Sequence, residues 1–178
     1  MTGPAGPGPV AAGPVAVLIG PPGAGKTSVG PLLAEQLGTS FRETDADISA
    51  AAGQPVSDIF IEQGEPAFRQ LEREAAARAL REHVGVLALG SGAVLDPDIQ
   101  QRLEGLRVIY LAAGFATIAR RMGLDRPRVV IPGNPRGRLR VMLEERRPLY
   151  EQLATVTVQT DDLDPDELAA EISARLKQ

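Results

Sequence analysis

The sequence contains no cysteine and a single histidine, His83. Without cysteine there can be no disulfide bond and no thiolate metal site, and one histidine cannot build a histidine-rich metal centre. Chains that lack cysteine suit the reducing cytoplasm, so we expect a cytoplasmic protein.

Long apolar runs are also missing. No stretch approaches the roughly 18 consecutive apolar residues of a membrane span, and the opening MTGPAGPGPVAAGP lacks the basic start and long apolar run of a signal peptide. We therefore expect no membrane association. The Gly/Pro/Ala-rich residues 1–14 are predicted to form a disordered leader, and residues 15–178 a single domain.

Positive charge is scarce and uneven. The formal net charge of −4 argues against a general nucleic-acid binder. Nine of the 19 basic residues lie between Arg120 and Arg147, which indicates either a local anion site or a solvated, arginine-rich helix face. Lys26 and Lys177 are the only lysines, so the lysine in the glycine-rich loop suggests that this position requires lysine.

Short apolar strands alternate with helical patterns along the whole chain. This alternation predicts an α/β fold with a mostly parallel, five-stranded sheet and helices on both faces. The last helix should begin at an Asp164 cap, with Pro165 in its first turn. The expected strands lie at 15–19, near 41, and at 85–90, 107–113 and 155–160, and the expected helices at 26–38, 65–83, 98–103, 115–123, 138–154 and from 164 onward.

Residues 20–27, GPPGAGKT, match the pattern G-x-x-x-x-G-K-[ST] in full, between a predicted buried strand and a predicted amphipathic helix. Such a loop turns successive N–H groups inward, and the helix N-terminus adds partial positive charge, so it binds phosphates. Lys26 would reach the β- and γ-phosphates of ATP, and the Thr27 hydroxyl would bind Mg²⁺. The alternative is a chance glycine turn at the start of a helix. The predicted nucleotide-binding residues of the loop are Gly23, Ala24, Gly25, Lys26, Thr27 and Ser28.

Three carboxylates, Glu43, Asp45 and Asp47, follow the second strand. In an extended chain Glu43 and Asp45 face the same side and would point into the crevice beside the phosphate loop. One could orient an acceptor hydroxyl or take its proton, and the other could hold a metal-bound water. The alternative is that they are the cap and first-turn acids of the helix that follows.

Arg69, near the start of the long helix, and the LGSGAV stretch at 89–94 are further candidates. Arg69 could bind an anion, or it could be a surface arginine paired with Glu65 or Glu72. Glycines at 90 and 92 would let a small ligand approach the backbone, although a plain strand-to-helix turn has the same sequence pattern.

Together these pieces resemble shikimate kinase, collinearly from about Val15 to the C-terminus. The resemblance implies the three-layer P-loop kinase fold, with a shikimate-binding segment and a mobile lid at about 124–135. It implies transfer of the γ-phosphoryl group of ATP to the 3-hydroxyl of shikimate, with Mg²⁺. We also expect the protein to be a monomer. The matching stretches are GPPGAGKTS, ETDADI, DIFIEQGEPAFRQLE, LALGSGAV, RRMGL, the arginine-rich loop before NPR, ERRPLY and VTVQTD.

The resemblance also implies roles for individual residues. Asp45 would bind the shikimate hydroxyls and accept the proton, while Arg69 and Arg146 would hold the carboxylate. On the nucleotide side, Arg121 and Pro165 would enclose the adenine. A lid arginine, Arg126 or Arg128, would neutralise charge in the transition state, with the spacing favouring Arg128. Gly90, Ser91 and Gly92 would contact the ring of shikimate. Thr27 and Glu43 would bind the metal.

The chain departs from the family pattern at four places. Glu43 stands where aspartate is usual, Ser91 where glycine is usual, and Leu163 where an adenine-stacking arginine is common, while the lid reads DRPRVVI. None removes a group that the chemistry requires. Two other functions stay open at this stage: a related small-molecule kinase such as a gluconate kinase, and a non-catalytic nucleotide-binding paralogue.

Overall fold

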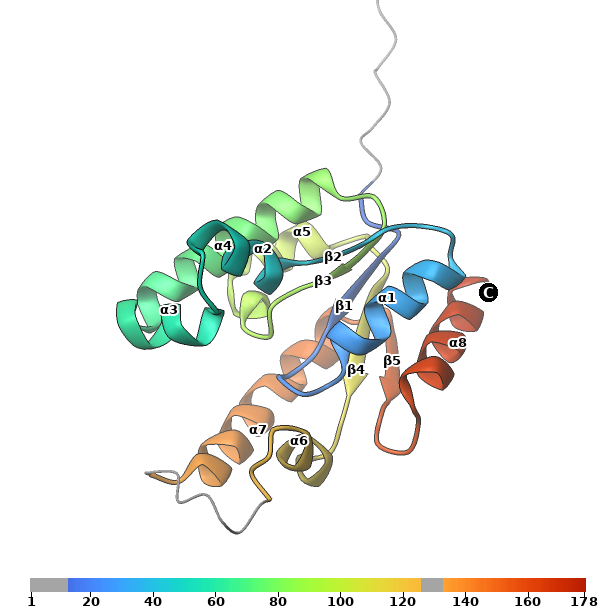
Figure 1. Ribbon diagram of the computed structural model, residues 1–178. Helices are drawn as coiled ribbons and strands as arrows, with labels where there is room; N and C mark the ends of the chain where they lie inside the picture. Colours follow the sequence, from blue (N-terminus) through green and yellow to red (C-terminus); the bar gives the residue numbers. More distant parts are fainter. Residues whose placement is uncertain (1–12, 126–132) are drawn as a thin grey trace, which may run out of the picture.

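The computed structural model describes residues 13–125 and 133–178 (Figure 1). Most of the predicted leader, and both lid candidates Arg126 and Arg128, lie outside these residues. Five strands form one sheet in the order β2-β3-β1-β4-β5, and every pairing between neighbours is parallel. The strands are β1 (Ala16–Ile19), β2 (Phe41–Glu43), β3 (Val86–Ala88), β4 (Val108–Ala112) and β5 (Val156–Gln159).

The three central strands, β1, β3 and β4, consist entirely of buried residues. Parallel strands with helices on both faces have no solvent side, so they read as continuous apolar runs rather than as alternating patterns. Alternate residues of β4 enter the two cores: Tyr110 packs on one side of the sheet, and Ile109 and Leu111 pack on the other.

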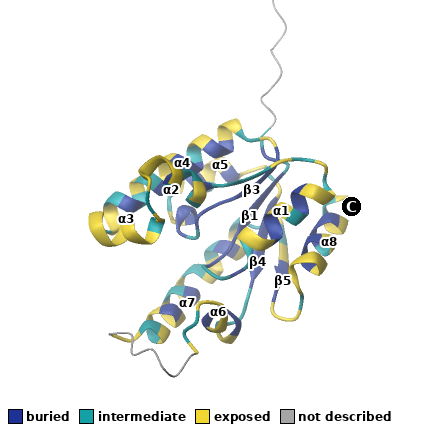
Figure 2. Ribbon diagram, viewed as in Figure 1, coloured by how far each residue is buried: buried dark blue, intermediate teal, exposed yellow. Residues whose placement is uncertain are grey.

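Helices cover both faces of the sheet, which confirms the predicted three-layer α/β fold (Figures 1 and 2). One face is covered by α1 (Lys26–Gln36) and α8 (Pro165–Leu176), and the other by α4 (Glu65–Glu82), α5 (Pro97–Leu103) and α7 (Pro135–Leu153). The remaining elements are α2 (Thr44–Ala52), α3 (Val56–Gln63), the short 3₁₀ helix η1 (Ala93–Leu95) and α6 (Phe115–Arg121).

Helices α2 and α3 pack on the N-terminal half of α4 and share a small apolar cluster with it. Ile48, Ile59, Phe68 and Ala75 are its buried members. This three-helix unit stands beside the edge strand β2, at the end of the sheet where the strands terminate (Figure 1). None of the helices in the described part of the chain combines the length and the apolar character needed to cross a membrane.

The predicted start of α8 is confirmed in detail. The Asp164 carboxylate accepts the Glu167 N–H at 2.9 Å, and the Glu167 carboxylate accepts the Asp164 N–H at 2.9 Å, which forms a reciprocal capping box. Pro165 occupies the first turn, where the helix needs no donor from its nitrogen. This cap fixes the direction in which α8 enters the nucleotide side of the site.

Candidate active site

A cavity of about 960 Å³ opens at the carboxyl ends of the strands. This is where ligands bind in open parallel sheets, because the loops after the strands diverge there. The cavity is lined from the phosphate loop and the starts of α1, α2 and α8, and from α3, α4, α6 and α7. The sequence-predicted residues that line it are Gly23, Ala24, Gly25, Lys26, Thr27, Ser28, Glu43, Asp45, Arg69, Ser91, Arg121, Arg146 and Pro165.

The phosphate loop adopts a conformation that its glycines permit. Gly23 and Gly25 have φ of 76° and 104°, values that residues with a Cβ rarely adopt. Gly25 is the N-cap of α1, and the loop and the first residues of the helix line the cavity. The cavity thus lies at a helix N-terminus, the position that the predicted anion site requires.

Lys26 lies across this loop. Its Nζ donates to the carbonyl oxygens of Gly20 at 2.7 Å and Pro21 at 3.1 Å. Withdrawal from water lowers the pKa of Lys26 to about 8, an effect opposed by the negative charges of Asp45 and Glu43. Near neutral pH the ammonium group is charged, and the nearby carboxylates compensate only part of the cost of its burial.

Thr27 and Glu43, the two residues predicted on the metal side, are in contact. The Thr27 hydroxyl donates to Glu43 Oε1 at 2.6 Å, although the two residues come from α1 and the end of β2. Within the described residues, no three His, Cys, Asp or Glu side chains gather to hold a metal by themselves. One hydroxyl and one carboxylate beside a phosphate loop fit Mg²⁺, which usually keeps waters and takes its remaining ligands from phosphates.

Asp45 lines the cavity, but the expectation of an extended chain from Glu43 to Asp45 is wrong. Strand β2 ends at Glu43, and Asp45 lies in the first turn of α2. A helix start places the two carboxylates near each other as well, because the chain turns at Thr44 into the helix. Asp45 is therefore a first-turn acid of α2, as in the alternative interpretation, and it also lines the cavity.

Asp45 has an unusual environment. Its Oδ1 is buried and has no hydrogen-bond partner among the described residues. Burial raises the pKa of the Asp45 carboxyl, the charge of Glu72 raises it further, and Lys26 opposes both. Buried polar atoms are nearly always paired, so an orphaned acceptor in a cavity wall indicates a ligand that donates to it.

Arg69 forms the predicted pairs within its helix and also lies in the cavity wall, where anion binding stays a prediction. It lines the cavity, and it is also paired within α4: Nη1 donates to Glu72 Oε2 at 2.6 Å, and Nε and Nη2 lie 3.4 Å from Glu65 Oε1. Glu72 is almost completely buried, whereas Glu65 is largely exposed. The Glu72 pair therefore does most of the orienting of the guanidinium.

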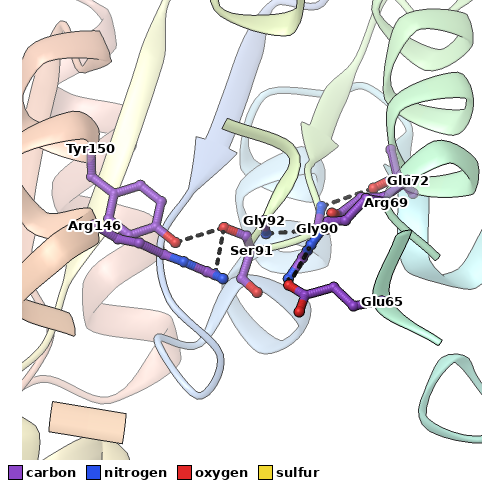
Figure 3. Close-up of polar contacts among 9 residues, drawn as sticks. Glu65, Arg69, Glu72, Gly90, Ser91, Gly92, Arg146 and Tyr150 are labelled. Carbon is purple, nitrogen blue, oxygen red and sulfur yellow. Dashed lines mark hydrogen bonds and ion pairs between the residues drawn. The ribbon is translucent and has the colours of Figure 1, made fainter. Parts of the chain in front are cut away.

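The Gly-Ser-Gly loop after β3 is fixed by side chains from three helices. Figure 3 shows those of α4 and α7. Thr44 of α2 accepts the Gly90 N–H at 2.9 Å, and Glu72 of α4 accepts the Gly92 N–H at 3.1 Å. The Ser91 carbonyl accepts from Tyr150 Oη at 2.7 Å and from Arg146 Nη1 at 3.3 Å, both on α7.

The two glycines of this loop are explained by close neighbours. A Cβ on Gly90 would lie 2.6 Å from Asp45 Oδ1, and a Cβ on Gly92 would collide with the Arg69 guanidinium. Glycine here lets the protein's own charged groups approach the backbone, a reason that the sequence analysis did not foresee. Of the three loop residues, Ser91 lines the main cavity, and Gly92 lines a smaller one beside Arg69.

On the nucleotide side, Arg121 connects the phosphate loop to the turn before α8. Its Nη1 donates to the carbonyl oxygens of Gly23 at 3.1 Å and Ala24 at 3.2 Å, and its Nη2 donates to the Thr160 carbonyl at 3.0 Å. Leu163 and Pro165, beyond that turn, line the same cavity. Arg121 thus holds together the two segments that enclose this side.

The arginine cluster of 120–147 was interpreted either as an anion site or as a solvated helix face, and its members differ in their surroundings. Arg121 and Arg146 line the cavity, whereas Arg136 and Arg140 pack over the Phe115 ring at 5.1 and 4.3 Å. Arg136 also donates to the Leu124 carbonyl at 3.1 Å, at the edge of the described part of the expected lid. Arg126 and Arg128 themselves lie outside the described residues.

Three further residues support the site and were not among the predicted functional residues: Thr44, Glu72 and Tyr150. Glu72 follows Arg69 by three positions and Tyr150 follows Arg146 by four, so each faces the same side of its helix as its arginine. That spacing is the signal that could have identified both. The buried Thr44 carries no comparable signal, because its partner Gly90 lies 46 positions further along the chain, in the loop after β3.

Comparison with known proteins gives consistent results. The shikimate kinase family model matches residues 22–177. The shikimate kinase of Thermobifida fusca is 55% identical over 162 residues, covering 91% of this chain and 94% of that protein. That of Salinispora arenicola is 51% identical over 163 residues, covering 92% and 98%.

Solved structures agree with this result. A shikimate kinase from Acinetobacter baumannii in complex with shikimate superposes with a TM-score of 0.83 at 32% identity, covering 93% of each chain. A gluconokinase from Sinorhizobium meliloti gives a TM-score of 0.57 at 22% identity, also over 93% of each chain. The second likeness concerns the fold alone.

Proposed function

The chain belongs to the shikimate kinase family and is an ATP-dependent kinase, and from this premise we propose that it transfers the γ-phosphoryl group of ATP to the 3-hydroxyl of shikimate. One observation carries the proposal: the buried, unpartnered Oδ1 of Asp45 shares a cavity with Lys26, Arg69 and Arg146. A lysine beside the phosphate loop suits a nucleotide. A carboxylate that accepts from hydroxyl groups and two guanidinium groups that bind a carboxylate suit a hydroxylated acid.

The donor half of the proposed site is the phosphate loop. Its inward N–H groups and the N-terminus of α1 hold the phosphates of ATP, and Lys26 exchanges its two carbonyl partners for β- and γ-phosphate oxygens. The Thr27 hydroxyl and Glu43 would hold Mg²⁺, whose positive charge would offset the negative charge of the phosphates. Arg121 and Pro165 enclose the adenine.

The acceptor half is formed by α2, α4 and α7. Asp45 accepts a hydrogen bond from the hydroxyl that attacks and takes its proton as the phosphoryl group is transferred, a role that its raised pKa favours. The planar forks of Arg69 and Arg146 hold the carboxylate of shikimate. Glu72 and the Gly90–Gly92 loop keep these arginines in place.

The lid arginine completes the proposed site, and both of its candidates lie outside the described residues. Arg126 or Arg128 would reach the phosphates and stabilise charge in the transition state. We retain the expectations of a monomer that acts in the cytoplasm, without nucleic-acid or membrane partners, as predictions.

A substrate panel tests the proposed function. ADP release is measured with ATP and shikimate, with ATP and gluconate, and with ATP alone, each with and without Mg²⁺. We expect turnover only with shikimate and Mg²⁺ together. Turnover with gluconate in place of shikimate would indicate the related small-molecule kinase, since two arginines and an acid suit any polyhydroxy acid. Tight ATP binding with no turnover on either acceptor would indicate a non-catalytic nucleotide-binding protein.

A further inference from the structure

Tyr150 joins the apolar core to the polar loop of the site. It lies on α7 one turn after Arg146, and only 1% of its surface is exposed. Its ring stacks on that of Tyr110 of β4, with centroids 5.1 Å apart and planes inclined by 21°. Its hydroxyl nevertheless donates to the Ser91 carbonyl at 2.7 Å (Figure 3). The stacked rings of Tyr110 and Tyr150 are anchored on β4 and α7, and this stack fixes the direction of the Tyr150 hydroxyl.

The loop that receives this hydrogen bond connects the two arginines proposed to hold the carboxylate. Gly92 is tied through its N–H to Glu72, which holds Arg69, and Ser91 is tied through its carbonyl to Arg146. Two consecutive loop residues therefore link arginines on two different helices. The separation of the guanidinium groups depends on where this loop lies.

Tyr150 is the firmer of the two donors to the Ser91 carbonyl. The Arg146 contact is longer, at 3.3 Å, and a carboxylate bound to Arg146 would compete with it. The Tyr150 hydroxyl has no such competitor, because it is enclosed in the core. Burial also raises the pKa of Tyr150 to about 12, so the hydroxyl stays a donor throughout the pH range of an assay.

We propose that Tyr150 is a positioning residue for the carboxylate of the substrate: its hydroxyl fixes the Ser91 carbonyl to α7 and so holds Arg146 at the correct distance from Arg69. This inference rests on the proposed function. Tyr150 does not touch the reacting atoms, so its removal should weaken shikimate binding and leave phosphoryl transfer intact.

The test compares Tyr150→Phe with Tyr110→Phe. The two residues are the only tyrosines in the chain, and each substitution keeps the ring stack and deletes one hydroxyl. Loss of one buried hydrogen bond predicts a rise in the KM for shikimate of about 3- to 10-fold in Tyr150→Phe. We expect kcat and the KM for ATP to stay close to those of the wild type, and the Tm to fall by only about 2–4 °C, the effect of one lost hydrogen bond. Tyr110→Phe should leave all four values unchanged.

A spectroscopic readout is available because the chain has no tryptophan. In Tyr110→Phe the remaining tyrosine emission comes from Tyr150, and we expect it to change as shikimate is titrated. In Tyr150→Phe it comes from Tyr110 and should respond less. Equal responses in the two variants would count against the proposal.

The kinetic outcomes separate this proposal from the proposed function. An unchanged KM for shikimate in Tyr150→Phe, with a wild type that turns shikimate over, would overturn the positioning role alone. A parallel loss of kcat, both KM values and Tm would also overturn it, because that pattern marks a purely structural residue. A wild type that neither binds nor phosphorylates shikimate would overturn both.

Discussion

Glu72 holds Arg69 through a 2.6 Å ion pair between Oε2 and Nη1, and its other oxygen accepts the Gly92 N–H at 3.1 Å. One buried carboxylate thus orients an arginine in the cavity wall and the loop opposite it. The geometry resolves a choice that the sequence left open, because an arginine paired within its own helix can also face a binding cavity.

Glu72→Gln tests this relationship. The amide oxygen can still accept the Gly92 N–H, but the charge that orients Arg69 is lost, so we expect the KM for shikimate to rise about 10-fold. The free energy of unfolding should fall by about 1–3 kcal/mol, measured by urea titration. Glu65→Gln is the matched control. Its exposed pair with Arg69 predicts less than about a twofold change in KM, in line with the small free energies of exposed pairs. Equal effects of the two substitutions would contradict the assigned role of Glu72.

Asp45→Asn should separate activity from stability. Loss of the proton acceptor predicts a fall in kcat of about 10²- to 10⁴-fold. The raised pKa of Asp45 means that its ionised form destabilises the folded state, and that this cost appears as pH rises through the folded-state pKa. The variant should therefore have a Tm at neutral pH equal to or above that of the wild type, and the difference should vanish in acid below the unfolded pKa.

Asp47→Asn is the control for Asp45, on the same helix. Asp47 pairs with Arg42 at 2.7 Å and does not line the main cavity, so its substitution should leave kcat unchanged. A loss of activity in Asp47→Asn as large as in Asp45→Asn would show that the effect comes from α2 as a whole.

Lys26→Met should abolish turnover without unfolding the protein. The folded-state pKa of about 8 lies below the ordinary value of 10.5, so the unfolded chain binds the proton more tightly. Stability of the wild type relative to the variant should therefore increase as pH rises between about 8 and 10.5, as the folded-state lysine loses its charge. Thermal unfolding of both proteins across this range measures the difference. A variant that is unfolded at neutral pH would contradict the assignment of Lys26 to phosphate binding.

Arg126→Ala and Arg128→Ala, compared side by side, identify the lid arginine. Loss of a charge-stabilising donor predicts a fall in kcat of about 10²-fold or more for one of them, with the other near the wild type. The ungapped spacing favours Arg128. Arg102→Ala, which removes a surface arginine paired with Asp98 on α5, controls for the loss of one positive charge. Wild-type kcat in both lid variants would remove this step from the proposed mechanism.

The parts of the fold that follow local rules were predictable from the sequence. The apolar runs of β1, β3 and β4, the complete phosphate-loop motif and the Asp164 cap each depend on a few consecutive residues, and the structure confirms all three. The conformation around Asp45 was not predictable in this way. The residues after β2 are compatible with both strand and helix, and packing of α2 against α4 decides between them.

The partners of Thr44 and Tyr150 in the loop after β3 could not be predicted from the sequence. The contacts of Thr44 with Gly90 and of Tyr150 with Ser91 join residues 46 and 59 positions apart. Nothing local to either residue signals its partner. The steric reason for Gly90 and Gly92 is likewise visible only once Asp45 and Arg69 have been placed beside them.

The identity of the product tests the central claim most directly. ATP, Mg²⁺ and shikimate are incubated with the protein, and the phosphorylated product is examined by phosphorus and proton NMR. We predict one ADP for each molecule of shikimate phosphorylated, with phosphorus coupled to the proton on carbon 3. In the time that the wild type needs to convert its shikimate, we expect no product with Lys26→Met and at most about 1% conversion with Asp45→Asn. Phosphate on another hydroxyl, or ADP release with unmodified shikimate, would contradict it.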